Sequence, residues 1–304
     1  MRRKYYVLDV FSDRALSGNP LAALVDCDGL ETEAMQKIAA EFNLSETIFI
    51  LAPRDPVNTA RLRIFTPQAE LPFAGHPTVG GAILVAELRA AALLRAQDLR
   101  VVLEENIGTI TCTVSHRPNS ARRAHFIMPK LPSRIGLPQD KDRLAAALGL
   151  NAAEIGFDRH VPTVYSAGLP FTFVPIINRA ALARAKPRLD LFDLAFGSSG
   201  APGAAYLYTR ETVDEAHDFH ARMFAPSWGV SEDPATGAAA AAFTGVLMAF
   251  EKVPDGSHAL AIEQGYELGR PSLITLTLDV EQSVLVEASI GGAAVIVAEG
   301  TLDL

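Results

Sequence analysis

The sequence has little cysteine and lacks the short motifs in which cysteine usually acts. Only Cys27 and Cys112 occur in 304 residues, and their spacing matches neither CxxC nor a paired set of metal ligands. A disulfide scaffold is therefore excluded, and two structural thiols in a reducing compartment are the simplest interpretation. The remaining composition, 49% hydrophobic and 20% charged, is typical of a globular protein.

Basic residues are also scarce. The chain has 27 Lys and Arg against 35 Asp and Glu, a formal charge of −8, and its one basic triplet is residues 2–4. Such a chain repels phosphate backbones and anionic lipid, so neither nucleic acid nor a membrane is an expected partner. The most apolar run, residues 237–250, is shorter than the roughly 20 residues that cross a bilayer, and the N-terminus lacks a signal-peptide pattern. A cytoplasmic protein is expected.

Motifs for metal, nucleotide and acyl-transfer chemistry are absent, since HExxH, GxGxxG, GK[ST] and GxSxG do not occur. His217 and His220 are three residues apart in a strand-like segment, which predicts opposite faces of the strand. The adjacent Glu104 and Glu105 are expected to diverge for the same reason and to form no carboxylate pair. The glycine-serine segment 197–203 is interpreted as a loop without a phosphate-binding role. No metal and no cofactor are expected.

Three motifs recur in the same order along the chain, which indicates an internal repeat. RIFTP at 63–67 returns as RMFAP at 222–226, PTVGGA at 77–82 as PATGAA at 234–239, and GNPL at 18–21 as GLPF at 168–171, at offsets of 159, 157 and 150 residues. An ancient duplication therefore predicts two similar domains with a site between them. The expected domains are residues 1–118, with the last strand at 294–304 as a candidate to complete the first domain, and residues 119–293.

Short strand patterns dominate both halves. Runs of β-branched or apolar residues between turn residues predict strands at 5–10, 21–25, 46–51, 59–65, 99–103, 107–115, 124–128, 160–166, 172–177, 204–209, 215–224, 260–264, 273–278, 284–288 and 294–300. Residues Met35, Ile38, Ala39 and Phe42 form one stripe of an amphipathic helix capped by Thr32. Short surface helices are expected at 144–148 and 180–185.

Two further helices, at about 77–94 and 234–250, are each expected to begin at a proline in the first helical position. Both are apolar or small on every side, from residue 79 to 86 and from 237 to 250, and a helix without a polar face is a buried one. We therefore predict an α+β fold of two pseudo-symmetric domains. Each is a highly curved, mostly antiparallel, barrel-like β-sheet wrapped around a central buried helix.

His76 and Asp233 occupy matching places, each directly before the proline of a central helix. Asp233 has a simple alternative role as a helix N-cap, whereas histidine is a poor cap and His76 follows Gly75 in a turn that allows close backbone approach. The first amides of each helix carry the positive end of its dipole and can hold a carboxylate. A small acid is therefore the expected ligand.

Glu46 is the third candidate, at the start of a predicted strand. It shares a face with Ile48 and Ile50, because residues of the same parity lie on one side of a strand. On an inward face it would be a carboxylate at the rim of an apolar interior, suited to taking up and returning a proton. The alternative is an exposed carboxylate at the beginning of a strand.

At these residues the sequence resembles the phenazine-biosynthesis PhzF-like family, which shares the two-domain fold of diaminopimelate epimerase. The matching pieces are GNP at 18–20, SET at 45–47, FTP at 65–67, FAGHPT at 73–78, EDPATG at 232–237, QG at 264–265 and GRPS at 269–272. The resemblance thus extends over nearly the whole chain.

The resemblance implies a homodimeric, cofactor-independent isomerase with its site in a cleft between the domains. Glu46 would move a proton between carbons of a small carboxylate substrate, with His76 and Asp233 as catalytic partners. The implied substrate-binding residues are Asn19, Ser45, Gly75, Thr236, Gly237 and Ala238.

Two features separate this chain from related enzymes. The phenazine enzymes of this family resemble PATGS at the second helix, and this chain has Ala238 in place of the serine. The missing hydroxyl weakens the case for their substrate, trans-2,3-dihydro-3-hydroxyanthranilate. Neither helix start carries a cysteine, so a two-thiol racemase is disfavoured. The remaining alternative is a catalytically silent relative that binds a small anion or a protein partner.

Overall fold

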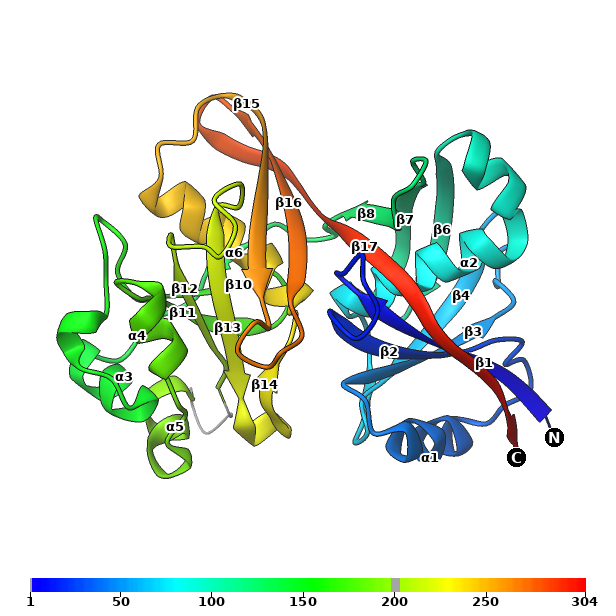
Figure 1. Cartoon of the computed structure of the whole chain (residues 1–304), viewed down its shortest axis with the longest axis horizontal. Helices are drawn as coiled ribbons and strands as arrows, with labels where there is room; N and C mark the ends of the chain where they lie inside the picture. The colour runs from blue at the N-terminus through cyan, green and yellow to red at the C-terminus, as the bar shows by residue number, and fades with distance from the viewer. Residues whose placement is uncertain (1, 198–202) are drawn as a thin grey trace. The chain divides into compact units, whose positions relative to one another are not determined.

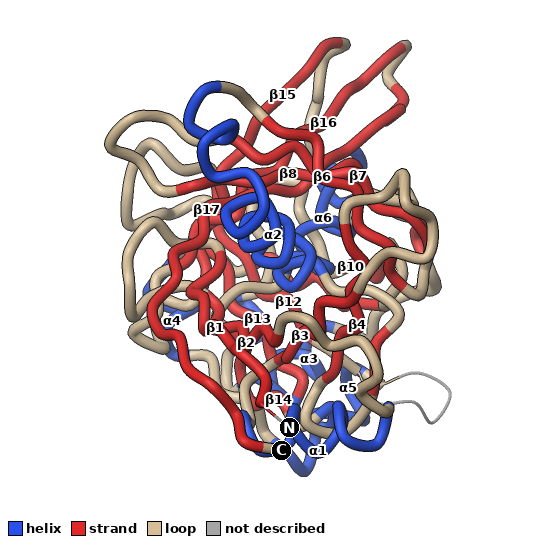
Figure 2. Tube along the Cα trace, turned by 90° about the vertical axis from the view of Figure 1, so that its right-hand side faces the viewer, coloured by secondary structure: helices blue, strands red, loops and turns tan. Residues whose placement is uncertain are grey.

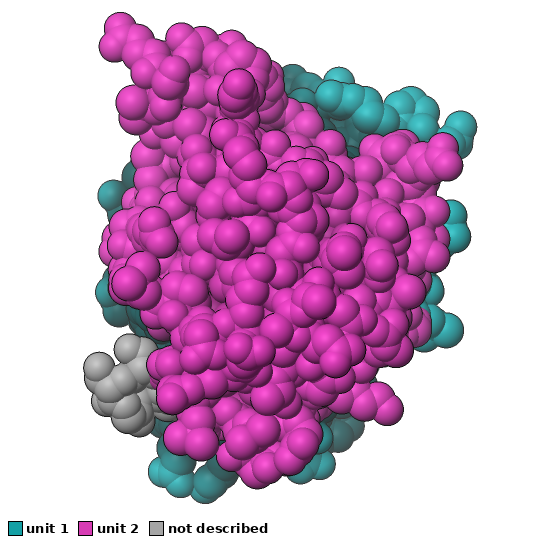
Figure 3. Space-filling view, turned by 90° about the vertical axis from the view of Figure 1, so that its left-hand side faces the viewer, with its two compact units in different colours: residues 1–127, 290–304 teal, residues 128–289 magenta. Residues whose placement is uncertain are grey.

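The computed structural model describes residues 2–197 and 203–304, so most of the segment 197–203 that we interpreted as a loop lies outside the described residues. The chain divides into two compact units, Met1–Ile127 with Ile290–Leu304, and Met128–Ser289 (Figure 3). The first boundary falls at residue 127, nine residues beyond the expected 118, because strand β8 (Arg122–Ile127) pairs with β7 (Gly108–Ser115) and so belongs to unit 1. The last strand returns to the first unit from residue 290.

Unit 1 is a closed ring of eight strands. Its strands are β1 (Arg2–Val10), β2 (Asn19–Leu24), β3 (Glu46–Leu51), β4 (Ala60–Phe65), β6 (Leu99–Glu105), β7, β8 and the long last strand β17 (Val284–Asp303). They pair in that order, and β17 closes the ring by pairing with both β8 and β1. The pairs β2–β3 and β4–β6 are parallel. The short β5 (Glu70–Leu71) adds to β4.

Helix α2 (Gly75–Ala96) lies inside this ring (Figure 2). All of residues 75–86 are buried, as the absence of a polar face predicted. Gly80 and Gly81 permit the close fit, since a Cβ there would lie 2.6 Å from Leu21 Cδ2 and 2.8 Å from Leu62 Cδ1. By length and hydropathy α2 could cross a membrane, but its burial within the unit is that of a core helix. Helix α1 (Thr32–Phe42) packs outside the ring.

Unit 2 repeats this arrangement. Its main strands are β10 (Thr163–Ser166), β11 (Pro170–Pro175), β12 (Ala205–Thr209), β13 (Phe219–Ala225), β15 (Gly256–Gln264) and β16 (Ser272–Glu281), with short β9 (Ser133–Arg134) and β14 (Val230–Asp233). Successive main strands pair antiparallel, parallel, antiparallel, parallel and antiparallel, as β1, β2, β3, β4, β6 and β7 do in unit 1. Figure 1 shows the central helix α6 (Gly237–Phe250) among them.

The outer face of unit 2 carries the helices α3 (Lys141–Leu148), α4 (Arg179–Arg184) and α5 (Leu189–Phe196), and two 3-10 turns lie at Ala152–Glu154 and Pro226–Trp228. Leu144, Leu182 and Phe192 from these helices form one apolar cluster with Leu207 and Phe224 of the sheet. Helix α5 was not expected from the sequence. The predicted fold class is confirmed, with one buried helix in each curved sheet.

Side-chain hydrogen bonds also repeat between the units at an offset of 159 residues. Glu104 accepts hydrogen bonds from the backbone N–H groups of Arg54 and Asp55 and from the Asn58 amide. Glu263 accepts from the backbone N–H groups of Val213 and Asp214 and bonds to His217. All four pairs of equivalent positions differ by the offset that separates RIFTP from RMFAP. These contacts support the duplication inferred from the sequence.

The helix starts differ from the prediction. Helix α2 begins two residues before Pro77, which is tolerated because the first turn of a helix needs no backbone N–H. Helix α6 begins three residues after Pro234, which instead lies in the turn that follows β14. Thr32 is the first helical residue of α1 rather than its cap, which is Glu31.

Candidate active site

Glu46 and His76 are brought together inside unit 1. Glu46 is the first residue of β3, whose other five residues are all buried, and His76 is the second residue of α2. Glu46 Oε2 lies 3.4 Å from His76 Nε2, and the two side chains are 17% and 5% exposed. The carboxylate therefore lies at the rim of the apolar interior, beside the start of the central helix.

The histidine of this pair is neutral. Burial lowers the pKa of His76 to about 3, because the buried ring is out of contact with the water that would stabilise its charged form. Its contact with Glu46 is consequently not an ion pair, and 3.4 Å is longer than an ordinary hydrogen bond. A neutral imidazole at this place can orient a carboxylate or a substrate without competing for its proton.

The other predicted residues of unit 1 lie on or directly before the elements that carry this pair or pair with them. Asn19, fully buried, begins β2, and β2 pairs in parallel with β3. It follows Gly18, whose φ of +68° and close approach to Val10 O exclude a side chain at that turn. Ser45 directly precedes Glu46, and Gly75 opens α2, whose N-cap Ala74 offers no side-chain hydrogen bond.

Asp233 is not the N-cap of α6, contrary to one sequence interpretation. It is the last residue of β14, and the N-cap is Thr236, because Pro234 and Ala235 form a turn before the helix. The Thr236 hydroxyl donates to Asp233 Oδ2 at 2.7 Å instead of capping the helix. Asp233 is 8% exposed.

Gly237 and Ala238 are the first two residues of α6, and no side chain caps them. Gly237 is buried and Ala238 is partly exposed. Strand β12, which takes the place of β3 in unit 2, begins at Ala205. Glu46 of the first unit therefore has no carboxylate counterpart at the start of that strand.

Glu105, which the sequence placed only on the opposite face from Glu104, is a buried acid. The Thr78 hydroxyl lies 2.7 Å from both Ala74 O and Glu105 Oε1. The hydroxyl donates to both oxygens, and the Glu105 carboxyl is enclosed in the interior. Burial accordingly raises the pKa of Glu105 to about 8. The sequence signal that could have indicated this residue is the repeat, in which Glu104 and Glu105 correspond to Glu263 and Gln264 at the offset of 159 residues.

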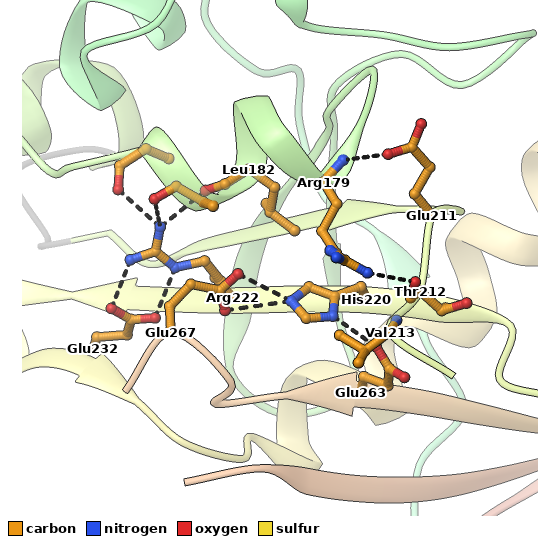
Figure 4. A network of polar contacts seen from close by, with 12 residues as sticks. Arg179, Leu182, Glu211, Thr212, Val213, His220, Arg222, Glu232, Glu263 and Glu267 are labelled. Atoms are coloured by element: carbon orange, nitrogen blue, oxygen red, sulfur yellow. Dashed lines mark hydrogen bonds and ion pairs between the residues drawn. The ribbon is translucent and has the colours of Figure 1, made fainter. Parts of the chain in front are cut away.

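A second polar network, in unit 2, corrects the prediction for His217 and His220. His217 precedes β13 and is not in the strand, so both rings reach Glu263, at 2.8 and 2.7 Å. The other nitrogen of His220 faces Glu267 at 3.1 Å (Figure 4). Glu263 is fully buried. Within the described residues no group of three or more His, Cys, Asp or Glu is arranged to hold a metal.

The charges of this network stabilise one another. Burial alone would lower the pKa of His220, but its hydrogen bonds to Glu263 and Glu267 outweigh burial and raise it. Burial alone would raise the pKa of Glu263, but hydrogen bonds from His220 and the backbone lower it to about 2. Because carboxylates accept on both sides of the ring, His220 is doubly protonated and links β13 to β15.

Replacing His220 with glutamine is expected to destabilise the protein by roughly 3 kcal/mol, because Glu263 loses a buried charged partner. The contribution of His220 is present below its unfolded pKa near 6.5 and is lost as pH rises through its raised folded pKa. That of Glu263 is present above 4.5 and is lost as pH falls toward 2. Denaturation of wild type and His220→Gln should differ most between about pH 4.5 and 6.5. The control His258→Gln, at a partly exposed ring, should change little, and a pH-independent difference would contradict the charge argument.

A depression on unit 2 has a volume of about 750 Å³ and is lined by residues that include Arg179, Arg210, Glu211, Glu215 and His217. It contains none of the predicted site residues, and its charges are of both signs. Arg179 already donates to Thr212 O, and its backbone N–H donates to Glu211 (Figure 4). It is not a candidate site for a small acid.

Both cysteines are free and buried. Burial raises the pKa of Cys27 to about 12, and that of Cys112 well above its ordinary value. A thiolate is disfavoured at either position, so these residues do not resemble the acid–base thiols of a cysteine racemase.

Comparison with known proteins assigns the chain to a family. The profile of the PhzC-PhzF family, described as phenazine biosynthesis-like protein, matches residues 8–300. A Mesorhizobium japonicum protein named as an uncharacterized isomerase is 49% identical over 304 residues, covering 99% of this chain and 98% of its own. The trans-2,3-dihydro-3-hydroxyanthranilate isomerase of Pseudomonas chlororaphis is 33% identical, covering 99% of both chains.

Structural similarity gives the same assignment. The crystal structure of a PhzF-family phenazine biosynthesis protein of Bacillus anthracis matches with a TM-score of 0.89 and 28% identity, covering 100% of both chains. The family that the motifs indicated is thereby confirmed. With nearly the whole chain matched in sequence and in fold, the protein belongs to the PhzC-PhzF family of phenazine biosynthesis-like proteins.

Proposed function

We propose that the chain is an isomerase that moves a proton between two carbons of a small carboxylate substrate, with Glu46 as the proton carrier. The observation that carries this proposal is the placement of Glu46 Oε2 3.4 Å from the buried, neutral His76 at the start of α2. Two curated relatives named as isomerases, 49% and 33% identical over essentially the whole chain, support the reaction class.

The proposed step is balanced without a further reactant. The Glu46 carboxylate removes a proton from one carbon of the substrate, and the electron pair of that C–H bond shifts within the substrate. The resulting carboxylic acid returns the proton to a second carbon, which restores Glu46. Because nothing is oxidised or reduced overall, the proposal requires no redox cofactor. His76, kept neutral by burial, would orient Glu46 or the substrate.

The substrate carboxylate would be held by helix ends. The backbone amides of Gly75 and His76 open α2, those of Gly237 and Ala238 open α6, and neither N-cap supplies a side-chain hydrogen bond. Such amides carry the positive end of the helix dipole and favour an anion. We propose that both helix ends bind the substrate, with Asp233 as a further catalytic residue and with Asn19, Ser45 and Thr236 as substrate-binding residues.

The substrate itself is proposed by class. The relative from Pseudomonas chlororaphis acts, by its name, on trans-2,3-dihydro-3-hydroxyanthranilate, a small cyclic acid. At the start of α6 this chain has Ala238, which supplies no hydroxyl to the substrate. A related small carboxylate is therefore our proposed substrate, and the phenazine precursor is the first compound to test.

Deuterium exchange tests the proposal directly. The protein is incubated in D₂O with trans-2,3-dihydro-3-hydroxyanthranilate and with a panel of small unsaturated acids, and carbon-bound deuterium is followed by mass spectrometry and NMR. We expect deuterium at the protonated carbon of an isomerised product. Binding of an acid by calorimetry without any exchange across the panel would favour the silent anion-binding relative instead.

A further inference from the structure

Gln264 is a fully buried amide that touches three groups around Asp233. As the last residue of β15, it donates from Nε2 to Asp233 O at 2.8 Å and to Thr236 Oγ1 at 2.9 Å. Its Oε1 accepts the backbone N–H of Thr236 at 3.1 Å. The amide thus bonds both ends of the turn that connects β14 to α6.

Only one assignment of donors and acceptors satisfies all of these hydrogen bonds. The backbone N–H of Thr236 can only donate, so it fixes Oε1 of Gln264 on its own side and directs the NH₂ group toward the Thr236 hydroxyl. Because that hydroxyl accepts from the amide, its single hydrogen is left for Asp233 Oδ2, 2.7 Å away. The backbone therefore determines, through two side chains, that Asp233 receives a hydrogen bond at Oδ2.

We propose that Gln264 is a positioning residue that acts through the Thr236 hydroxyl to fix the orientation and the ionised state of Asp233. The inference rests on the proposed function in one respect, the place of Asp233 in the reaction. The hydrogen bonds themselves are independent of any substrate. A carboxylate that accepts a fixed hydrogen bond is held both in position and in its charged form.

The repeat provides an independent argument for the amide. In the strand register, Arg61 of β4 lies opposite Glu104 of β6, as His220 of β13 lies opposite Glu263 of β15. The next residues along β6 and β15, Glu105 and Gln264, therefore occupy equivalent positions. Each contacts a threonine hydroxyl near the start of its central helix. The first unit has an acid at this position, which accepts a hydrogen bond from its threonine. The second uses an amide, which donates at every pH and cannot place a negative charge beside Asp233.

The Thr236 hydroxyl is tested with matched variants. Thr236→Val removes the hydroxyl at nearly constant shape and leaves the amide bonds of Gln264 to the backbone in place, whereas Thr236→Ser retains the hydroxyl. The probe is the ¹³C NMR titration of the Asp233 carboxyl, assigned with Asp233→Asn. In Thr236→Val its midpoint should rise by about one pH unit, the size expected for one lost hydrogen bond to a charged group. In Thr236→Ser it should stay near wild type.

A double-mutant cycle tests the contribution of Gln264. Gln264→Glu introduces a carboxylate that, once ionised, turns the Thr236 hydroxyl away from Asp233. The rise in the Asp233 midpoint should therefore be larger with Thr236 present than in the Thr236→Val background. Equal rises in both backgrounds would mean that the new charge acts on Asp233 through space alone and would overturn the inference, as would an unchanged midpoint in Thr236→Val.

The same variants separate this inference from the proposed function. If Asp233 takes part in the reaction, exchange in D₂O should show a larger fall in kcat for Thr236→Val than for Thr236→Ser. A raised Asp233 midpoint together with unchanged kcat would leave the positioning role intact and remove Asp233 from the reaction. An unchanged midpoint rejects the positioning role whatever the turnover.

Discussion

Glu46→Gln is expected to lower turnover by at least about 10²-fold, the low end for loss of an acid–base group, while the fold and ligand binding remain near wild type. Glutamine has the shape of glutamate but cannot cycle a proton at neutral pH. The stability should change little because the side chain is at the rim of the interior and its neighbour His76 is neutral. The variant thus isolates proton transfer from packing.

The measurement is deuterium incorporation into a substrate that wild type isomerises, together with calorimetry of the same acid against both proteins. Glu41→Gln, at an exposed position on α1, is the matched control and should leave exchange unchanged. Wild-type exchange rates in Glu46→Gln would remove Glu46 from the proposed mechanism. Lost binding with normal unfolding would reassign it to substrate recognition.

The features that the sequence predicted well are those that periodicity and repetition carry. Residues 79–86 lack a polar face, and burial of such a segment is the only way to hide it, so the central helix of unit 1 followed from composition alone. The offset of 159 between RIFTP and RMFAP marks β4 and β13, which have the same strand neighbours in their units. Local pattern and global fold agree at these places.

The features that the sequence did not predict depend on contacts between distant segments. His217 and His220 were expected on opposite faces, but a turn before β13 brings both to Glu263, a residue more than 40 positions away. The first turn of α6 was misplaced because the choice between Asp233 and Thr236 as N-cap depends on the turn that Gln264 holds. Residue spacing alone contains no information about such partners.

Glu105 and Glu104 illustrate the same limit within one strand. Alternation predicted that they point to opposite faces, and it could not tell which face is buried. Glu104 is bound by backbone amides of the loop at 54–55, whereas Glu105 lies under the start of α2 beside Thr78. Two adjacent glutamates therefore have pKa values displaced in opposite directions by their surroundings.

Glu105→Gln is expected to stabilise the protein at pH 8 and to have no such effect at pH 4.5. The folded pKa of Glu105 is raised to about 8, so between about 4.5 and 8 the folded state holds a proton that the unfolded state has released. Wild-type stability must therefore fall as pH rises across this range, by about 3 to 5 kcal/mol at most for a shift of this size. Glutamine is neutral in both states and escapes this loss.

The replacement also fits the hydrogen bonds already present. With glutamine at 105 the side chain can still bond to the Thr78 hydroxyl, as the amide of Gln264 bonds to the hydroxyl of Thr236 in unit 2. Urea denaturation of both proteins at several pH values between 4.5 and 8.5 measures the difference. Glu104→Gln is the opposite control, because that carboxylate has a lowered pKa and should cost stability above pH 4.5 when removed. Parallel pH curves for wild type and Glu105→Gln would show that the pKa of Glu105 is not raised in the folded protein and would contradict this prediction.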